Sequence, residues 1–70
     1  MNRTAAANIV CMGYNAQNML LEVQFHQDTR RYCYQEVPEE IWYRMKQAES
    51  IDAFFNAFIL NRYEEQIRGL

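Results

Sequence analysis

The sequence predicts an α+β domain, in which a three-stranded antiparallel β-meander is followed by two α-helices packed on one face of the sheet. In the first half of the chain, apolar and polar residues alternate, most clearly over Met19–His26. In the second half, apolar residues recur every three to four positions, as at Ile41, Met45 and Ala48. Pro38 separates the halves, because proline ends an extended segment and suits the first turn of a helix.

The length and composition are those of one small folded domain. The chain has 70 residues, of which 50% are hydrophobic, with only two Gly and one Pro, so disorder is excluded. We expect a flexible N-terminus over 1–7, the domain over 8–67 and a C-terminal tail over 68–70. The apolar share is high for so small a domain, which suggests burial against a second molecule. A protein partner or a homodimer is therefore expected.

Charge and cysteine usage narrow the class of protein further. Seven basic and nine acidic residues give a net charge of −2, so no overall field attracts a polyanion. Cys11 and Cys33 do not form a CxxC pair, and no apolar run resembles a signal peptide or is long enough to span a bilayer. We therefore expect a cytoplasmic protein with reduced thiols and no contact with a membrane.

The first predicted strand is short and is followed by a turn. Ile9–Met12 is rich in β-formers, Gly13 to Asn15 close it, and Asn15–Asn18 has the asparagine chemistry of a turn. The sequence does not decide which side chains of this strand face away from the helices. They are either Ile9 and Cys11 or Val10 and Met12.

The second and third strands carry the clearest alternation. Over Met19–His26, one face takes the apolar residues Met19, Leu21, Val23 and Phe25. A short hairpin over Gln27–Thr29 then leads to a third strand over Arg30–Glu36. Tyr32 and Tyr34 would supply matching bulk on the face covered by the helices, while the residues between them point outward.

Two helices are predicted after Pro38. The first covers Pro38–Ala48, with acidic residues in its first turn, where the helix dipole favours them. Ser50 is a good N-cap for the second. The inner face of that helix is aromatic and consists of Phe54, Phe55, Phe58, Ile59 and Tyr63. The pattern also allows this helix to continue through Glu64–Ile67 before Gly69 stops it.

The order of several landmarks resembles a known family. They are Gly13-Tyr14, Leu21-x-Val23-x-Phe25, Tyr32-x-Tyr34, Val37-Pro38, Ala48-x-Ser50 and Phe55-Asn56-x-x-Ile59-x-x-x-Tyr63. In this order they resemble the KTSC domain, a small module found at the C-terminus of some lysyl-tRNA synthetases and as a stand-alone bacterial or phage protein. The resemblance covers about residues 8–63. It departs at Asp28-Thr29, where the family usually has Gly, and at Asp52, which replaces the Gly of Ser-x-Gly. It implies no enzyme activity, and it suggests RNA binding only through the synthetases.

Arginines and tyrosines are the candidate binding residues. Tyr32 and Tyr34 could form a stacking platform for bases, although packing in the core is the favoured interpretation. Arg30 and Arg31 could grip a phosphate or an acidic partner, and the patch could extend to two further arginines, Arg44 and Arg62. A solvated charged surface is the simpler explanation for these arginines.

The sheet face away from the helices is a candidate protein interface. On it, Leu20 and Cys33 would lie among polar residues, namely Glu22, Gln24, His26, Arg31 and Gln35. Apolar residues on such a small exposed face suggest that a second subunit or a protein target covers it. Scattered surface hydrophobes are an equally good explanation.

The sequence favours neither an active site nor a metal site. The chain has one His and one Ser, and its carboxylates lie in adjacent pairs that do not converge on a substrate. His26, Cys11 and Cys33 fall on separate predicted strands, so they lack the close spacing of zinc ligands. We therefore expect no enzyme activity, no metal and no cofactor.

The function predicted from these features is a small binding module that acts on a protein. It would be of bacterial, phage or prophage origin, such as an inhibitor or adaptor of a host protein. The alternative is an RNA- or nucleotide-binding module that uses Arg30, Arg31, Tyr32 and Tyr34.

Overall fold

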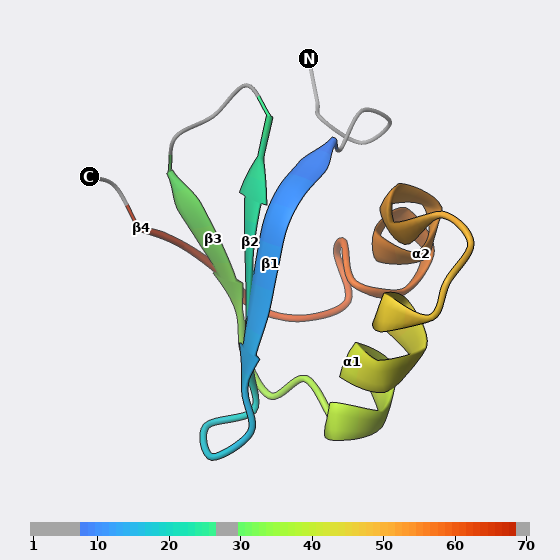
Figure 1. The fold of residues 1–70 in the computed structure, drawn as a ribbon. Coiled ribbons are helices and arrows are strands. Elements are labelled where there is room, and N and C mark those ends of the chain that lie inside the picture. Colours follow the sequence, from blue (N-terminus) through green and yellow to red (C-terminus); the bar gives the residue numbers. More distant parts are fainter. Residues whose placement is uncertain (1–7, 27–29, 69–70) are drawn as a thin grey trace.

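The structure is a computed structural model, which describes residues 8–26 and 30–68. Within them, an antiparallel sheet forms one layer and two helices form a second layer against one of its faces (Figure 1). The strands lie in the sheet in chain order, as β1 (Ile9–Asn15), β2 (Leu20–Phe25), β3 (Arg31–Tyr34) and β4 (Glu65–Arg68). The helices α1 (Glu39–Lys46) and α2 (Ile51–Phe58) come between β3 and β4. The α+β class is confirmed, whereas the expected count of three strands is wrong.

β1 is longer than predicted and contains a bulge. It continues to Asn15, where the predicted turn begins, and the Asn15 Oδ1 atom accepts hydrogen bonds from the backbone N–H groups of Gln17 and Asn18. Ile9 lies opposite Phe25 while Cys11 lies opposite Gln24, so Val10 is the extra residue. The bulge changes the alternation. It places Ile9 and Met12 on the core side together, so neither of the two predicted pairings is right.

β2 has the predicted face, apart from its first residue. Leu21, Val23 and Phe25 are buried, as the alternation predicts. Met19 is instead 39% exposed and has a φ of 54°, so it belongs to the turn before the strand. The strand ends at Phe25, and the N–H of His26 donates to the Asn8 carbonyl at 2.8 Å. The predicted hairpin over Gln27–Thr29 lies outside the described residues.

β3 is shorter than predicted, and a buried corner follows it. Glu36 has a φ of 60°, which turns the chain out of the sheet before Pro38. Val37 is fully buried at this corner, and its N–H donates to the Met19 carbonyl at 2.9 Å. The hydroxyl of Tyr14 donates to the Val37 carbonyl at 2.6 Å. Both backbone groups of Val37 are thus paired, which a buried corner requires.

The helices start as predicted but end earlier. Pro38 precedes α1, and Glu39 and Glu40 occupy its first turn. Ser50 caps α2, since its Oγ atom accepts a hydrogen bond from the N–H of Ala53 at 3.1 Å. Each helix is 8 residues long, so both depend on packing against the sheet rather than on their own stability.

The segment after α2 forms a strand where a helix was allowed. α2 ends at Phe58, and Asn61 has a φ of 66°, a left-handed conformation that asparagine tolerates and that a continuing helix excludes. The chain then runs beside β3, where the N–H of Gln35 donates to the Glu64 carbonyl at 3.0 Å. The helical continuation over Glu64–Ile67 is therefore wrong, and Arg68 belongs to β4 rather than to a tail.

The core lies between the helices and one face of the sheet. Phe55 of α2 makes edge-to-face contacts with Phe25 and Tyr34, with ring centroids 5.6 and 5.4 Å apart. Tyr32 packs against Phe25 in the same manner, at 4.9 Å. Tyr32 and Tyr34 are 3% and 1% exposed, which confirms their assignment to the core.

Candidate functional site

The candidate site is the face of the sheet turned away from the helices. No described helix packs on it (Figure 1). The strand register arranges its side chains in rows that cross the sheet, because residues directly opposite each other share a face. One row contains Cys11, Gln24, Arg31 and Arg68, and the next contains Gly13, Glu22, Cys33 and Gln66. These eight residues, with Asn15 and Leu20 beside them, are called the open face below.

Two arginines give the open face its positive charge. Arg31 and Arg68 lie directly opposite each other on β3 and β4. Like charges in this position repel each other, so an anion between or beside them would be favoured. The guanidinium of Arg31 lies 3.7 Å from the Glu22 carboxylate across the neighbouring strand. This ion pair is largely exposed, so it holds Arg31 in place only weakly.

Cys33 lies at the centre of the open face but is not accessible. Its side chain points to the predicted side, yet it is 0% exposed. The sequence missed this burial because β4 adds a strand on the far side of β3, so side chains surround Cys33. Burial raises the pKa of the thiol and outweighs the neighbouring Arg68, which lowers the pKa. Cys33 is therefore a protonated, packed thiol rather than a reactive one.

A shallow hollow lies at Gly13. It has a volume of about 160 Å³ and is lined by side chains of the open face, chiefly Cys11, Glu22, Gln24 and Arg31. A Cβ atom added at Gly13 would meet nothing within 4 Å, so the missing side chain leaves open space. A side chain of a partner could enter this space and reach both the Arg31 guanidinium and the Glu22 carboxylate at its wall.

The predicted Arg30–Arg31 cluster does not form. Neighbouring residues of an extended chain point to opposite sides, and Arg30 lies with Tyr32, on the side of the core. Its guanidinium is 5.9 Å from the centroid of the Tyr32 ring, and its Nη2 atom donates to the Tyr32 hydroxyl at 3.3 Å. Arg68, from the strand that the sequence did not predict, stands beside Arg31 instead.

The tyrosine pair is not exposed to stack on bases. Both rings are buried under the helices, and the Tyr34 hydroxyl donates to the Glu65 carboxylate at 2.6 Å. Arg44 and Arg62 do not extend the patch either. Arg44 lies on α1, with its guanidinium 5.9 Å from the centroid of the Phe58 ring, and Arg62 follows α2. The helical layer and the open face therefore carry separate arginines.

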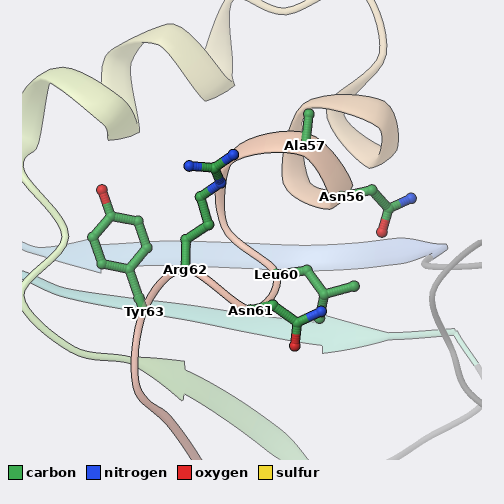
Figure 2. Close-up of a pocket in the computed structure, with 6 residues that line it drawn as sticks. All are labelled: Asn56, Ala57, Leu60, Asn61, Arg62 and Tyr63. Atoms are coloured by element: carbon green, nitrogen blue, oxygen red, sulfur yellow. The ribbon is translucent and has the colours of Figure 1, made fainter.

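A second hollow lies where α2 leads into β4 (Figure 2). Its volume is about 620 Å³, and it is lined by Asn56, Ala57, Leu60, Asn61, Arg62 and Tyr63. The Oδ1 atom of Asn56 is buried and accepts no hydrogen bond. The side chain of Arg62 rises toward α2 in the close-up, while the carboxamide of Asn56 lies on the far side of Leu60. These polar groups diverge, so the hollow does not focus them on one ligand.

Within residues 8–26 and 30–68, the structure shows no cluster of side chains that could hold a metal ion and no helix that could span a membrane. No three His, Cys, Asp or Glu side chains come together in that part of the chain. None of its helices is long and apolar enough to cross a membrane. The sequence did not identify Gln66 and Arg68 of the open face, because a single apolar residue, Ile67, is too weak a sign of a strand.

Comparison with known proteins agrees with this architecture. The family model of the KTSC domain matches residues 6–63. A similar fold is found in the crystal structure of a KTSC domain protein from Yersinia pestis, with a TM-score of 0.83. The two sequences are 31% identical, and the match covers 87% of this chain and 84% of that chain. No curated protein matches the chain. The family model and this structure support the same conclusion: the chain belongs to the KTSC domain family.

Proposed function

We propose that this KTSC domain is a non-enzymatic binding module that holds a protein partner on its open face. The observation that carries the proposal is the position of Arg31. It stands between Arg68 and Glu22, at the edge of the hollow over Gly13, on a face that no described helix covers. An acidic side chain of the partner would pair with Arg31, and a neighbouring side chain would fill the hollow.

A protein fits this surface better than a nucleic acid does. Positive and negative groups alternate on the open face, as in Arg31 beside Glu22, whereas a polyanion needs a continuous basic track. The net charge of −2 adds general repulsion. Arginine is also enriched in the centre of protein interfaces, where its forked donors pair with carboxylates.

The absence of catalysis is part of the proposal. In the described segments, the only His, His26, follows β2, and Ser50 is occupied as a helix cap. The buried thiol of Cys33 has a raised pKa, which is unfavourable for a nucleophile. We further propose that the protein acts in the cytoplasm of a bacterial cell, as an adaptor or inhibitor that a bacterium or phage encodes. This origin rests on the stand-alone KTSC proteins that the chain resembles.

The experiment is capture from a bacterial lysate with the tagged protein, with and without nuclease. The wild type should retain a discrete protein after nuclease treatment. Arg31→Glu should release it, because the reversed charge repels an acidic side chain. Arg44→Glu is the matched control, since it makes the same change on the helical layer, and it should retain the protein. Retention by the Arg31 variant, or equal loss from both variants, would contradict the proposal.

The rival function, binding of RNA or a nucleotide, is supported by the adjacent Arg31 and Arg68. A gel-shift titration at several salt concentrations separates the two functions. RNA bound in the micromolar range, with an affinity that falls steeply as salt rises, would favour the rival. The protein-binding proposal predicts no shift at these concentrations.

A further inference from the structure

β4 lies at one edge of the sheet. Within the described residues, no strand pairs with its side opposite β3. Proteins usually keep such edges from pairing with another chain by means of a bulge, a proline, charged side chains or a very short strand. β1, at the other edge, has its bulge at Val10. β4 pairs with β3 residue by residue from Glu65 to Arg68 and has no bulge, proline or lysine. Only its length of 4 residues and the charges of Glu65 and Arg68 limit pairing, and a second copy can match those charges.

The geometry of β4 sets which of its groups face outward. The N–H of Gln35 donates to the carbonyl of Glu64, so the backbone N–H and C=O groups of residue 64 point toward β3. These groups alternate in direction along a strand, so those of residues 66 and 68 also point toward β3. The peptide groups of Ile67 therefore point toward the open edge. Its side chain lies on the helical side opposite Tyr32, yet it is 44% exposed. An apolar side chain and an open backbone thus meet at one edge.

We propose that two copies of the chain pair through β4 in antiparallel fashion, about a two-fold axis at Gln66, and form one continuous eight-stranded sheet. In this register, Gln66 lies opposite Gln66 of the second copy and Ile67 lies opposite its Glu65. Arg68 lies opposite Glu64 of the second copy.

Charge distinguishes this register from the one centred on residue 65. Residues that lie opposite each other must be on the same face of the sheet, and the faces alternate along β4. An even-numbered residue can therefore lie opposite only an even-numbered residue of the second copy, so the two-fold axis must pass through a residue. The step that centres on residue 65 would place two Glu65 carboxylates opposite each other, which is unfavourable. The register centred on Gln66 instead gives two Arg68–Glu64 pairs, one on each side of the axis. Each carboxylate also offsets the repulsion between Arg68 and Arg31 in the same copy.

The apolar contacts support the same arrangement. The two Ile67 side chains would be diagonal neighbours on the helical side, within reach of each other across the axis. The interface would be small, so we expect a dimer at micromolar rather than nanomolar concentrations. The seam leaves Arg31 and the hollow at Gly13 clear, so the dimer would carry two separate partner sites. Because Arg31 lies outside the seam, Arg31→Glu should abolish partner capture and leave the dimer intact.

Disulfide trapping tests the register. Gln66→Cys is made in a chain that also carries Cys11→Ser and Cys33→Ala, because Cys33 lies directly opposite Gln66 on β3 and would compete. In the proposed register, residue 66 lies opposite residue 66 of the second copy, and the two exchange no backbone hydrogen bonds. The Cα atoms of such a pair are about 4.5 Å apart, which suits a disulfide. Mild oxidation should convert most of the protein to a covalent dimer.

Two further cysteine positions serve as controls in the same background. Ile67→Cys lies opposite Glu65 and should cross-link much more slowly. Gln24→Cys lies on the open face and should stay monomeric; its cross-linking would indicate a face-to-face dimer instead. Faster cross-linking at position 67 or 24 than at position 66 would overturn the proposal.

Charge reversal provides a second test, by sedimentation velocity. Arg68→Glu and Glu64→Arg should each weaken the dimer at least about tenfold, because each places like charges opposite each other. The double variant restores opposite charges and should dimerise within about threefold of the wild type. At concentrations where the wild type is monomeric, Arg68→Glu should not lower the melting temperature, since it removes the repulsion from Arg31. A wild type that is monomeric at 1 mM, or a double variant as weak as the single ones, would refute the proposal.

Discussion

Tyr34 and Cys33 are neighbours on β3, but one packs under the helices and the other lies on the open face. On the helical side, Tyr34 joins Phe25, Tyr32 and Phe55 in a network of edge-to-face rings. On the open side, Cys33 lies among Glu22, Gln66 and two arginines. One strand therefore serves two purposes, because alternation separates the apolar packing that holds the fold from the charged groups that can meet a partner.

The largest effect should come from removing a ring on the helical side. Tyr34→Ala leaves a cavity beside Phe55 and should cost about 3–5 kcal/mol in the free energy of unfolding. Small domains have a total stability of about 5 kcal/mol, so circular dichroism should show a largely unfolded protein. Tyr34→Phe removes only the hydroxyl that donates to Glu65, and it should stay folded with a loss of about 1 kcal/mol. A Tyr34→Ala protein that melts like the wild type would place the ring outside the core.

A smaller loss should follow from breaking the contact that ties β1 to the corner before α1. The Tyr14 hydroxyl donates to the buried Val37 carbonyl, so Tyr14→Phe should cost about 1 kcal/mol in urea unfolding. Tyr43→Phe is the matched control, because its hydroxyl donates to Glu39 on the exposed side of α1. The control should lose under about 0.5 kcal/mol. Equal losses in the two variants would show that the Tyr14 contact contributes no more than a surface contact.

On the open face, truncation should barely change stability. Arg31→Ala removes an exposed ion pair with Glu22, so the free energy of unfolding should change by under about 0.5 kcal/mol. Gln24→Ala, on the neighbouring strand of the same face, controls for the loss of side-chain packing. A loss above about 1 kcal/mol for Arg31→Ala alone would mean that the open face also holds the fold together.

The smallest effect on stability is expected from labelling the two thiols. The rate of labelling reports how deeply each cysteine is buried. Cys11 is exposed, whereas Cys33 is buried and has a raised pKa. A thiol reagent at neutral pH should therefore label Cys11 quickly and Cys33 only as the protein unfolds. In Cys11→Ser, fast labelling should disappear while the slow phase stays. Fast labelling of that variant would show that the side chains around Cys33 do not cover it.

Much of the fold follows from local patterns in the sequence. The alternation over Leu21–Phe25, the two tyrosines of β3, Pro38 and the Ser50 cap all predict the elements that form. Each of these signals depends on residues a few positions apart, so the sequence contains it directly. The landmarks of the KTSC domain likewise led to the right family, because they mark these same local features.

The errors concern features that depend on distant contacts. β4 forms because the edge of β3 offers it a partner and because Asn61 turns the chain, and neither cause is visible in Glu65–Arg68 alone. The bulge at Val10 depends on pairing with β2 in the same way. The candidate site lies across all four described strands, and β4 was not predicted. The sequence therefore identified Arg31, Glu22 and Gln24 but placed Arg30 rather than Arg68 beside Arg31.

Site-specific photo-crosslinking in a lysate shows directly which surface a partner occupies, because the adduct forms with whatever protein lies against the photoreactive side chain. A photoreactive amino acid replaces Gln24 on the open face in one variant and Tyr43 on the exposed side of α1 in the other. Both variants should melt close to the wild type. If the open face holds the partner, position 24 gives a discrete protein adduct and position 43 gives none. An adduct from position 43 with none from position 24 would place the partner on the helices and contradict the proposed role of the open face.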